Sequence, residues 1–141
     1  GGQHRNKVET AIVLLDPETG ISAEASERRS QNDNRHVAIF RLRLNLALEF
    51  RAEVSADAPP SKLWTSRCQN RRISINPSHV EFPPLLAEAL DRIVACDWDV
   101  SLAAEQLHAT TSQLVRLLKH EPRATTLVNR ERQQRKMRSY K

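Results

Sequence analysis

The first residues, Gly1-Gly2-Gln3-His4-Arg5-Asn6-Lys7, are of types that could position a nucleophile or stabilise a developing oxyanion. Two adjacent glycines lack Cβ atoms, so their backbone can take positive φ and approach a ligand closely. Gln3 offers uncharged donors and an acceptor, and backbone N–H groups can stabilise a developing oxyanion. Arg5 and Lys7 suit phosphate. No strong general base is present, so the loop would need further groups from a partner.

The segments that must position this loop begin with a predicted β-hairpin. Asn6 can cap a short turn of helix that ends near Thr10. Residues 11–15 are an apolar run typical of a buried strand, and residues 21–26 alternate in the manner of a strand. Residues 16–20, Asp-Pro-Glu-Thr-Gly, have turn composition, with Gly20 supplying positive φ.

Residues 33–50 fit two periods. Val37, Phe40, Leu44 and Leu48 have helical spacing, whereas the leucines at 42, 44, 46 and 48 also fit the period of a strand. The segment is long for a strand and rich in helix formers, which favours a helix. Asn32 or Asn34 can cap its start.

Four blocks follow one another in this part of the chain. They are Gly1-Gly2-Gln3-His4-Arg5-Asn6-Lys7, Thr10-Ala11, Asp16-Pro17-Glu18-Thr19-Gly20-Ile21, and Glu27-Arg28-Arg29-Ser30-Gln31 with Asn34-Arg35. Over roughly residues 1–50 the chain resembles the catalytic domain of bacterial class I peptide chain release factors and of their ribosome-rescue relatives. Matching order and spacing make this a specific signal.

The resemblance implies an α+β domain over residues 1–54, in which a long helix packs on a small mixed sheet. It also implies ribosome-dependent hydrolysis of the ester between a peptide and tRNA, with a catalytic loop at Gly1, Gly2 and Gln3. Contacts to ribosomal RNA are implied for Arg5, Asn6, Lys7, Arg29 and Arg35. In the family a further strand precedes the loop, and codon-reading domains lie upstream. Neither is expected within these 141 residues.

Some of these polar residues also have a structural interpretation. Ser30 and Asn34 could cap the long helix while Gln31 braces the turn, and this is as plausible as direct contact with RNA. His4 is most simply a solvent-facing loop residue. The other histidines show no metal-ligand spacing with it.

Composition and charge narrow the classes of function. The chain has 141 residues, 4% aromatic residues and a net charge of +5. Residues 81–121 carry 7 acidic and 3 basic side chains, whereas residues 122–141 carry 7 basic and 1 acidic. Basic ends suit RNA. Cys68 and Cys96 form no metal or disulfide motif, and no apolar run could span a membrane. We expect a cytoplasmic protein without metal or organic cofactor.

Residues 55–82 are predicted to be a basic linker, with Pro59-Pro60 and Asn76-Pro77 as breakers. Trp64 could stack on an RNA base, but docking on a protein core is the simpler interpretation. The arginines of this segment fit either interpretation.

Residues 83–122 are predicted to form a small all-α domain. Leu85, Leu86, Ala89, Leu90 and Ile93 form an apolar stripe at helical spacing, and Pro83 or Pro84 suits its first turn. After a break at residues 97–99, two shorter helices joined at residues 108–110 resemble a helix-turn-helix. Pro122 is expected to end the last of them.

Residues 123–141 are predicted to be a basic tail, either disordered or folding on RNA. Such a tail is similar to the one with which rescue factors sense an empty mRNA channel. Its candidate RNA-binding residues are Arg130, Arg132, Arg135, Lys136 and Arg138.

The sequence thus predicts a monomeric, release-factor-like peptidyl-tRNA hydrolase that acts on ribosomal RNA and peptidyl-tRNA, with no membrane or DNA partner. Two alternatives stay open. One is a ribosome-binding protein without catalysis. The other is a DNA-binding regulator with Thr110, Thr111, Ser112, Gln113 and Arg116 on a recognition helix, against which the negative charge of this region argues.

Overall fold

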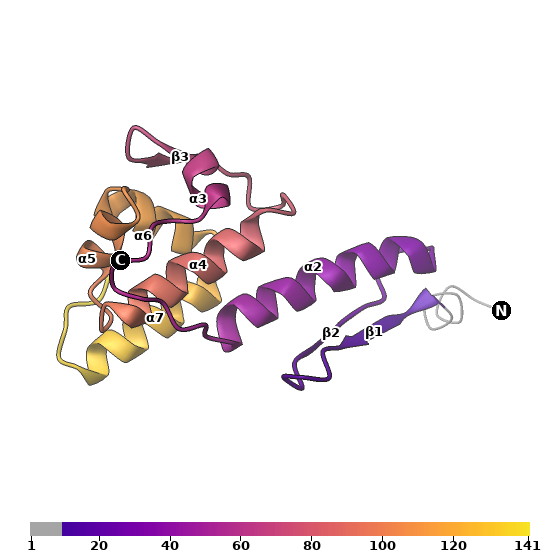
Figure 1. Cartoon of the computed structure of the whole chain (residues 1–141). Coiled ribbons are helices and arrows are strands. Elements are labelled where there is room, and N and C mark those ends of the chain that lie inside the picture. The colour runs from indigo at the N-terminus through magenta and orange to yellow at the C-terminus, as the bar shows by residue number, and fades with distance from the viewer. Residues whose placement is uncertain (1–9) are drawn as a thin grey trace. The chain divides into compact units, whose positions relative to one another are not determined.

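A computed structural model describes residues 10–141, and the chain divides into two compact units, residues 1–50 and 51–141 (Figure 1). Unit 1 is a β-hairpin with one long helix. Unit 2 consists of helices and a second, very short hairpin. The predicted α+β fold is therefore confirmed. Over the described residues each sheet is an antiparallel pair of strands.

The hairpin of unit 1 forms where the sequence predicts it. Strand β1 (Ile12–Leu15) pairs with β2 (Ser22–Ala25), with Ile12 opposite Ala25 and Leu15 opposite Ser22. The N–H of Gly20 donates to the carbonyl of Asp16 at 2.8 Å, and Gly20 has φ of +75°. That left-handed backbone is the reason for a glycine at the end of the turn.

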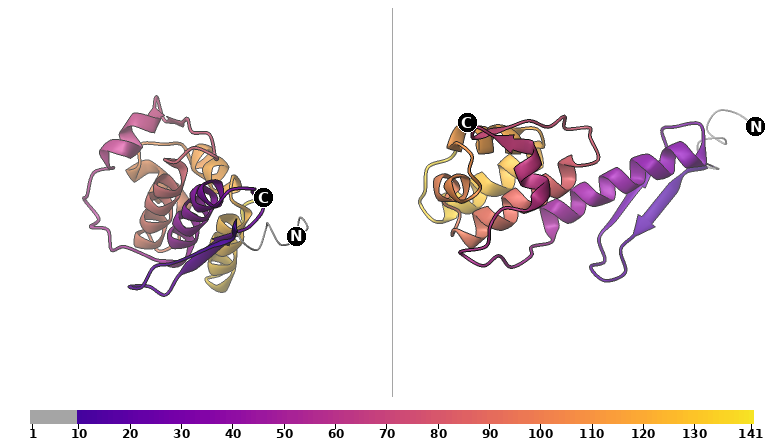
Figure 2. Two further views of the ribbon diagram at one scale, coloured as in Figure 1. Left: turned by 90° about the vertical axis from the view of Figure 1, so that its right-hand side faces the viewer. Right: turned by 45° about the horizontal axis from the view of Figure 1, so that its top comes forward.

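Helix α2 (Gln31–Glu49) covers one face of this hairpin, as Figures 1 and 2 show. The helix prediction is confirmed, but the predicted cap at Asn32 or Asn34 is wrong. Ser30 is the N-cap, and its hydroxyl accepts from the N–H of Asp33 at 3.0 Å. The structural interpretation of Ser30 is therefore the correct one.

Only one face of the hairpin is covered by the described residues. Ala23 and Ala25 are buried beneath α2, with Ala38 and Ala47 of the helix, whereas Val13 is 68% and Leu15 61% exposed. The expectation of a buried strand at residues 11–15 is wrong for its outer residues. A lone helix can cover one side of a two-stranded sheet and no more.

Two side chains of α2 bind the backbone of β2. The guanidinium of Arg41 donates to the carbonyl of Glu24 at 3.0 Å, and the amide of Asn45 donates to the carbonyl of Ser22 at 2.8 Å. These residues are four apart on the helix and two apart on the strand. The spacing of 1.5 Å per helical residue and about 3.3 Å per strand residue brings them together.

Unit 2 begins with a segment that folds against α4 (Phe82–Ala95). Arg51 forms an ion pair with Asp91 at 2.9 Å, the N–H of Ser61 donates to Glu88, and Arg92 donates to the carbonyl of Ala58. Residues 55–82, predicted to be a linker, contain α3 (Lys62–Arg67), β3 (Cys68–Gln69) and β4 (Arg72–Ile73). The stretch is thus largely packed on its own unit.

Trp64 of α3 shows how closely this segment is packed. Its side chain is 1% exposed, and its indole N–H donates to the carbonyl of Leu107 at 2.8 Å. The interpretation of Trp64 as a docked core residue is confirmed, and base stacking by Trp64 is excluded.

The predicted helices of unit 2 are present. Helix α4 starts with prolines, α5 (Val100–Gln106) is capped by Asp99, and α6 (Thr111–Lys119) is capped by Thr110. The buried residues of this region form its main core: Phe82, Leu85, Leu86, Leu90, Ile93, Val100, Leu107, Leu114 and Leu117. The turn between α5 and α6 has His108 at φ of 59°.

Residues 123–134, predicted as part of a tail, belong to helix α7 (Pro122–Gln134). Pro122, expected to end the helix before it, lies in the first turn of α7, and Glu121 is the cap. The chain then reverses at Lys136, which has φ of 59°, and runs back along the helix. The amide of Asn129 donates to the carbonyl of Tyr140 at 2.7 Å and accepts from its N–H at 2.8 Å.

Candidate functional site

The predicted catalytic loop, Gly1, Gly2 and Gln3, lies outside the described residues, as do Arg5, Asn6 and Lys7. The geometry of the candidate site therefore starts at Thr10, the first residue that the structure describes after this loop. From there the contacts lead to α2 and to the segment that precedes it.

Asn34 connects these segments. It is fully buried, and its amide N–H groups donate to the carbonyls of Thr10 at 2.8 Å and Arg28 at 3.1 Å. Its amide oxygen accepts from the N–H of Arg28 at 2.9 Å. The hydroxyl of Thr10 also donates to the carbonyl of Arg28, at 3.3 Å. One side chain thus fixes the exit of the loop to the chain before α2.

The role of Asn34 is consequently neither of the two that the sequence suggested. A buried amide that uses both of its polar atoms on backbone cannot also contact RNA, and it does not cap α2. The sequence did show a polar residue within the first turns of a helix. Only the fold shows that it joins Thr10 to Arg28.

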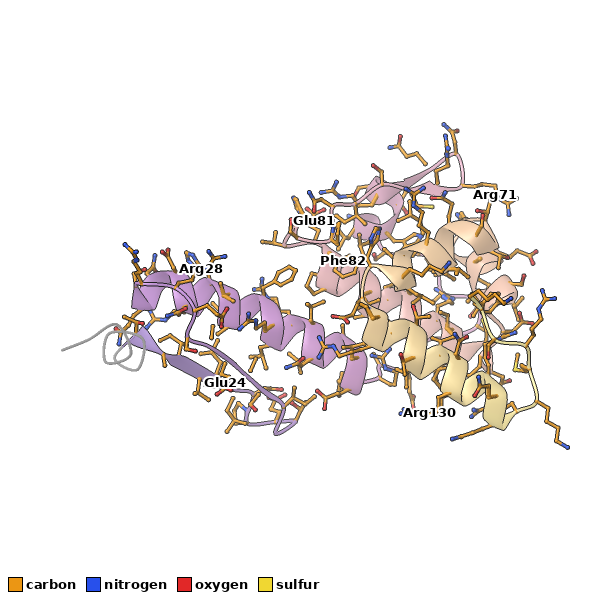
Figure 3. The ribbon with its side chains drawn as sticks, turned by 180° about the vertical axis from the view of Figure 1, so that it is seen from behind. Glu24, Arg28, Arg71, Glu81, Phe82 and Arg130 are labelled. Atoms are coloured by element: carbon orange, nitrogen blue, oxygen red, sulfur yellow. The ribbon has the colours of Figure 1, made fainter. Side chains whose placement is uncertain are left out.

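Arginines surround this connection. Arg28 and Arg29 precede α2 and Arg35 lies in its first turns, and all three are exposed (Figure 3 labels Arg28). Within residues 10–141 the side chains of Arg29 and Arg35 have neither an ion pair nor a hydrogen bond. The structure therefore leaves both candidate RNA-binding residues available to an anionic partner.

Glu27 neutralises a further arginine of this region, Arg41. Both of its carboxylate oxygens accept from the guanidinium of Arg41, at 2.7 and 2.9 Å. That hydrogen-bonded pair, with a bond from the N–H of Ser26, lowers the pKa of Glu27 to about 2. Arg41 is thereby neutralised, in contrast to Arg29 and Arg35.

The candidate residues of the C-terminal region fall into two groups. Arg130, Lys136 and Arg138 have exposed side chains without a partner among residues 10–141, and Figure 3 labels Arg130 on α7. Arg135 is paired with Glu131 at 2.9 Å, and its guanidinium lies 5.3 Å from the ring centre of Trp98. Three cations of this group are thus free to bind phosphate.

Arg132 is different, because it is only 7% exposed. Its guanidinium donates to the carbonyls of Arg138 at 2.8 Å and Trp98 at 2.6 Å, and it lies 4.6 Å from the ring centre of Tyr140. These contacts hold the returning C-terminal residues on α7. We therefore leave Arg132 out of the RNA-binding surface.

The predicted recognition helix is α6, and its polar face is occupied in part. Gln113 accepts the N–H of Ile73 at 3.0 Å, and the hydroxyl of Thr111 is hydrogen-bonded to that of Ser101 at 2.8 Å. The second hairpin thus lies beside the N-terminal half of α6. A recognition helix needs that half free to enter the major groove, so this arrangement argues against DNA readout.

The two cysteines of the chain are both held as thiols by their surroundings. Burial raises the pKa of the Cys68 thiol and that of the Cys96 thiol, which keeps both in the protonated, unreactive form. Over residues 10–141, His, Cys, Asp and Glu side chains form no group that could hold a metal ion. No helix of this part of the chain has both the length and the apolar character to cross a membrane.

Comparison with known proteins gives the family. A family model described as "RF-1 domain" matches residues 1–79, which is more than half of the chain. The chain belongs to the RF-1 domain family. Peptide chain release factor 1 of Xylella fastidiosa (strain 9a5c) is 41% identical over 64 residues, which are 45% of this chain and 18% of that protein. The chain thus corresponds to under a fifth of this relative. No solved structure matches it.

The RF-1 match reaches further than the resemblance seen in the sequence motifs. It continues beyond residue 50 through α3 and the β3–β4 hairpin of unit 2. It ends before α4, so the helices from α4 to α7 lie outside the matched range. The sequence motifs missed this extension, because residues 51–79 contain no block of comparable specificity.

Proposed function

We propose that this protein acts on the ribosome and hydrolyses the ester of peptidyl-tRNA through the loop Gly1-Gly2-Gln3. The observation that carries the proposal is the RF-1 domain match over residues 1–79, a range that includes this loop. The relative that is 41% identical is a peptide chain release factor, which supports the same class of reaction.

The residue types of the loop suit this reaction. Hydrolysis needs a placed water molecule and a donor to the charge that builds in the transition state. The backbone N–H of Gln3 would stabilise the leaving 3′-oxygen without titrating, and its side chain would admit water while excluding larger nucleophiles. The two glycines allow a backbone that would be strained with a Cβ. Ribosomal RNA would supply the other groups, so no cofactor is required.

The contacts of Asn34 support a scaffold for this loop. A loop that enters a ribosomal site needs a fixed exit, and Thr10 is fixed by the buried amide of Asn34. Arg29 and Arg35 lie on either side of Asn34 in the chain, and among residues 10–141 their guanidinium groups have no partner. They would contact RNA phosphates next to the loop, together with Arg5, Asn6 and Lys7.

We further propose that release is independent of a stop codon, as in rescue of stalled ribosomes. The support is the exposed basic group of α7 and the chain after it, namely Arg130, Arg135, Lys136 and Arg138. These residues would bind ribosomal RNA, with the protein acting as a cytoplasmic monomer. The alternative of a ribosome-binding protein without catalysis differs from the proposed function only in that its loop would not hydrolyse the ester.

No observation favours the DNA-binding alternative, because Gln113 and Thr111 are engaged within unit 2.

The test of codon independence is peptide release from three ribosomal complexes with the same peptidyl-tRNA. They carry an empty A site, a stop codon or a sense codon in the A site. We expect release from the complex with the empty A site at a rate that a stop codon does not increase. Release that requires the stop codon would contradict the rescue function while leaving hydrolysis intact. Binding without release from any complex would favour the non-catalytic alternative.

A further inference from the structure

Unit 2 contains a cleft of about 430 Å³ between the second hairpin and helix α6. Residues 72–75 form one wall, and Gln113, Arg116, Leu117 and His120 form the other. The two walls are about forty residues apart in the chain. The proposed function assigns no RNA contact to any of these residues.

Backbone contacts fix the two walls relative to each other. The side chain of Gln113 accepts the N–H of Ile73 at 3.0 Å, and the N–H of Thr110 donates to the carbonyl of Arg71 at 3.2 Å. On the other side of the hairpin the N–H of Ser74 donates to the carbonyl of Arg67 at 2.8 Å. The cleft is therefore held by the fold and does not depend on flexible side chains alone.

The lining combines positive charge with an apolar floor. Leu117 is buried, and Ile73 and Ile75 are half-buried, whereas Arg72, Arg116 and His120 are exposed. Within residues 10–141 the guanidinium groups of Arg72 and Arg116 have neither an ion pair nor a hydrogen bond. Among the residues that the structure describes, no acidic side chain lines the cleft.

The nearest acidic residues in the sequence are already neutralised. Glu81 is paired with Arg67 at 2.8 Å, and Glu121 is paired with Arg123 at 3.0 Å. Residues 81–121 are acidic as a whole, with 7 acidic and 3 basic side chains, yet two of those three bases, Arg116 and Lys119, lie in the last turn of α6. Arg71, labelled in Figure 3, precedes Arg72 in the chain and so marks where this wall of the cleft begins.

From these observations we propose that the cleft binds the sugar-phosphate backbone of RNA. Arg72 and Arg116 would each contact a phosphate, since the planar guanidinium matches its oxygens. The floor of Ile73 and Leu117 would take the apolar face of a ribose. This inference rests on the proposed function, in which the partner is ribosomal RNA, and it adds a contact in unit 2 to those of unit 1.

The same contacts disfavour an acidic peptide as the partner. A peptide strand that extended the hairpin would need the free N–H groups at the edge of β4. Gln113 already accepts the N–H of Ile73 there. RNA phosphates require only the side-chain donors that remain free.

The test uses the full chain and a fluorescein-labelled single-stranded RNA of 20 nucleotides, with binding followed by anisotropy from 0.05 to 0.3 M KCl. Each phosphate contact with single-stranded nucleic acid contributes about 0.7 to the slope of log K against log salt. For Arg72→Gln/Arg116→Gln we therefore expect the slope to fall by about 1.4, with affinity about 25-fold lower at 0.1 M salt. Arg72→Lys/Arg116→Lys should keep most of the slope.

The matched control is Arg43→Gln/Lys62→Gln, which removes two exposed charges that do not line the cleft. An equal loss of slope in this control would overturn the proposal. Tighter binding of a glutamate-rich peptide than of RNA would overturn it as well. So would displacement of RNA by inorganic phosphate beyond the effect of chloride at equal ionic strength, because the site would then be one for a small anion.

Peptide release measured on the same variants separates this inference from the proposed function. A wild-type protein that fails to release peptide, but whose RNA binding depends on Arg72 and Arg116, contradicts only the proposed function. A protein that releases peptide, but whose RNA binding ignores these arginines, contradicts only the cleft.

Discussion

Asn34 is a fully buried residue whose side chain joins Thr10, the first residue described after the glycine loop, to Arg28 in the chain before α2. Asn34→Ala would leave the carbonyl of Thr10 and the N–H of Arg28 without their buried partner. We expect it to lower the free energy of unfolding of unit 1 by about 1–3 kcal/mol. A urea titration in which hydrogen exchange of the amides of α2 reports unfolding measures this change.

If Asn34 also positions the loop, Asn34→Ala should lower the rate of peptide release by a larger factor than it lowers the affinity for the ribosome. Asn32→Ala is the matched control, because Asn32 is exposed on the same helix and should change neither quantity. Asn34→Asp keeps the acceptor for Arg28 but turns a negative oxygen toward two carbonyls, so it should be no better than alanine. Full release by a stably folded Asn34→Ala protein would contradict the positioning role.

Glu27 gives a prediction on pH. Its pKa is lowered to about 2 by the hydrogen-bonded Arg41, from 4.5 for the unperturbed group. Because the folded value is the lower one, the pair stabilises unit 1 above pH 4.5 and this contribution is lost as the pH falls toward 2. The pair is exposed, so its effect on stability is small and screened by salt.

NMR titration of the Glu27 carboxyl carbon measures the pKa directly. We expect a midpoint near 2 in the wild type and a higher one in Arg41→Gln, in which the bond from the N–H of Ser26 remains. Equal midpoints in the two proteins would show that the pair does not form in solution.

At the scale of the elements, Trp64 is the buried aromatic side chain through which α3 packs on the helices of unit 2. Trp64→Ala removes a fully buried indole and its bond to Leu107, which should destabilise unit 2 by about 3–5 kcal/mol. Trp64→Phe should cost less, since it mainly leaves the carbonyl of Leu107 unpaired. Hydrogen exchange should show lost protection in α5 and α6 and none in α2. Unchanged unit 2 stability with weaker RNA binding would contradict the docked role.

Helix α7 and the returning chain separate binding cations from structural ones. Arg130→Gln/Lys136→Gln/Arg138→Gln removes exposed charges, so we expect ribosome affinity to fall roughly tenfold or more with the melting temperature unchanged. Arg132→Gln should act in the opposite way. It leaves the carbonyls of Trp98 and Arg138 unpaired and should lower stability by about 2–4 kcal/mol.

For the triple variant and for Arg132→Gln, thermal unfolding measures stability and cosedimentation measures ribosome binding. A fully stable Arg132→Gln protein with lost ribosome binding would contradict the assignment of Arg132 to the fold. A deletion of residues 130–141 could not make this distinction, because it removes the packing of Arg132 and Tyr140 together with the free charges.

Across the whole molecule, the features that the sequence predicted are those set by local chemistry. The turn at residues 16–20 required Asp, Pro and Gly in order, and the breaks expected at residues 97–99 and 108–110 do separate the helices of unit 2. Helix α2 followed from its length and composition. The apolar stripe of α4 was visible because all of its members face one core.

The features that the sequence did not predict depend on distant contacts. Pro122 was interpreted as the end of a helix, although proline is equally favoured in the first turn of the next one, and it begins α7. Arg132 is like its neighbours in sequence, and only the carbonyls of Trp98 and Arg138 set it apart. Strands β3 and β4 have two residues each, too few to show a period.

The match to the RF-1 domain extends from unit 1 into unit 2. It includes all of unit 1 and the part of unit 2 that ends at residue 79. The cleft at Arg72 uses one wall from inside the match and one from α6 outside it. RNA binding in the cleft would therefore be a property of this chain's own combination of segments.

The most direct test of the central claim is single-turnover peptide release from ribosomes with an empty A site, with wild type beside Gly2→Ala at saturating protein. Loss of a transition-state contact through the loop should slow release by about 100-fold or more while ribosome binding stays within about twofold. Release at the wild-type rate by Gly2→Ala would contradict hydrolysis through this loop. Absence of ribosome binding by the wild type would contradict the ribosomal function itself.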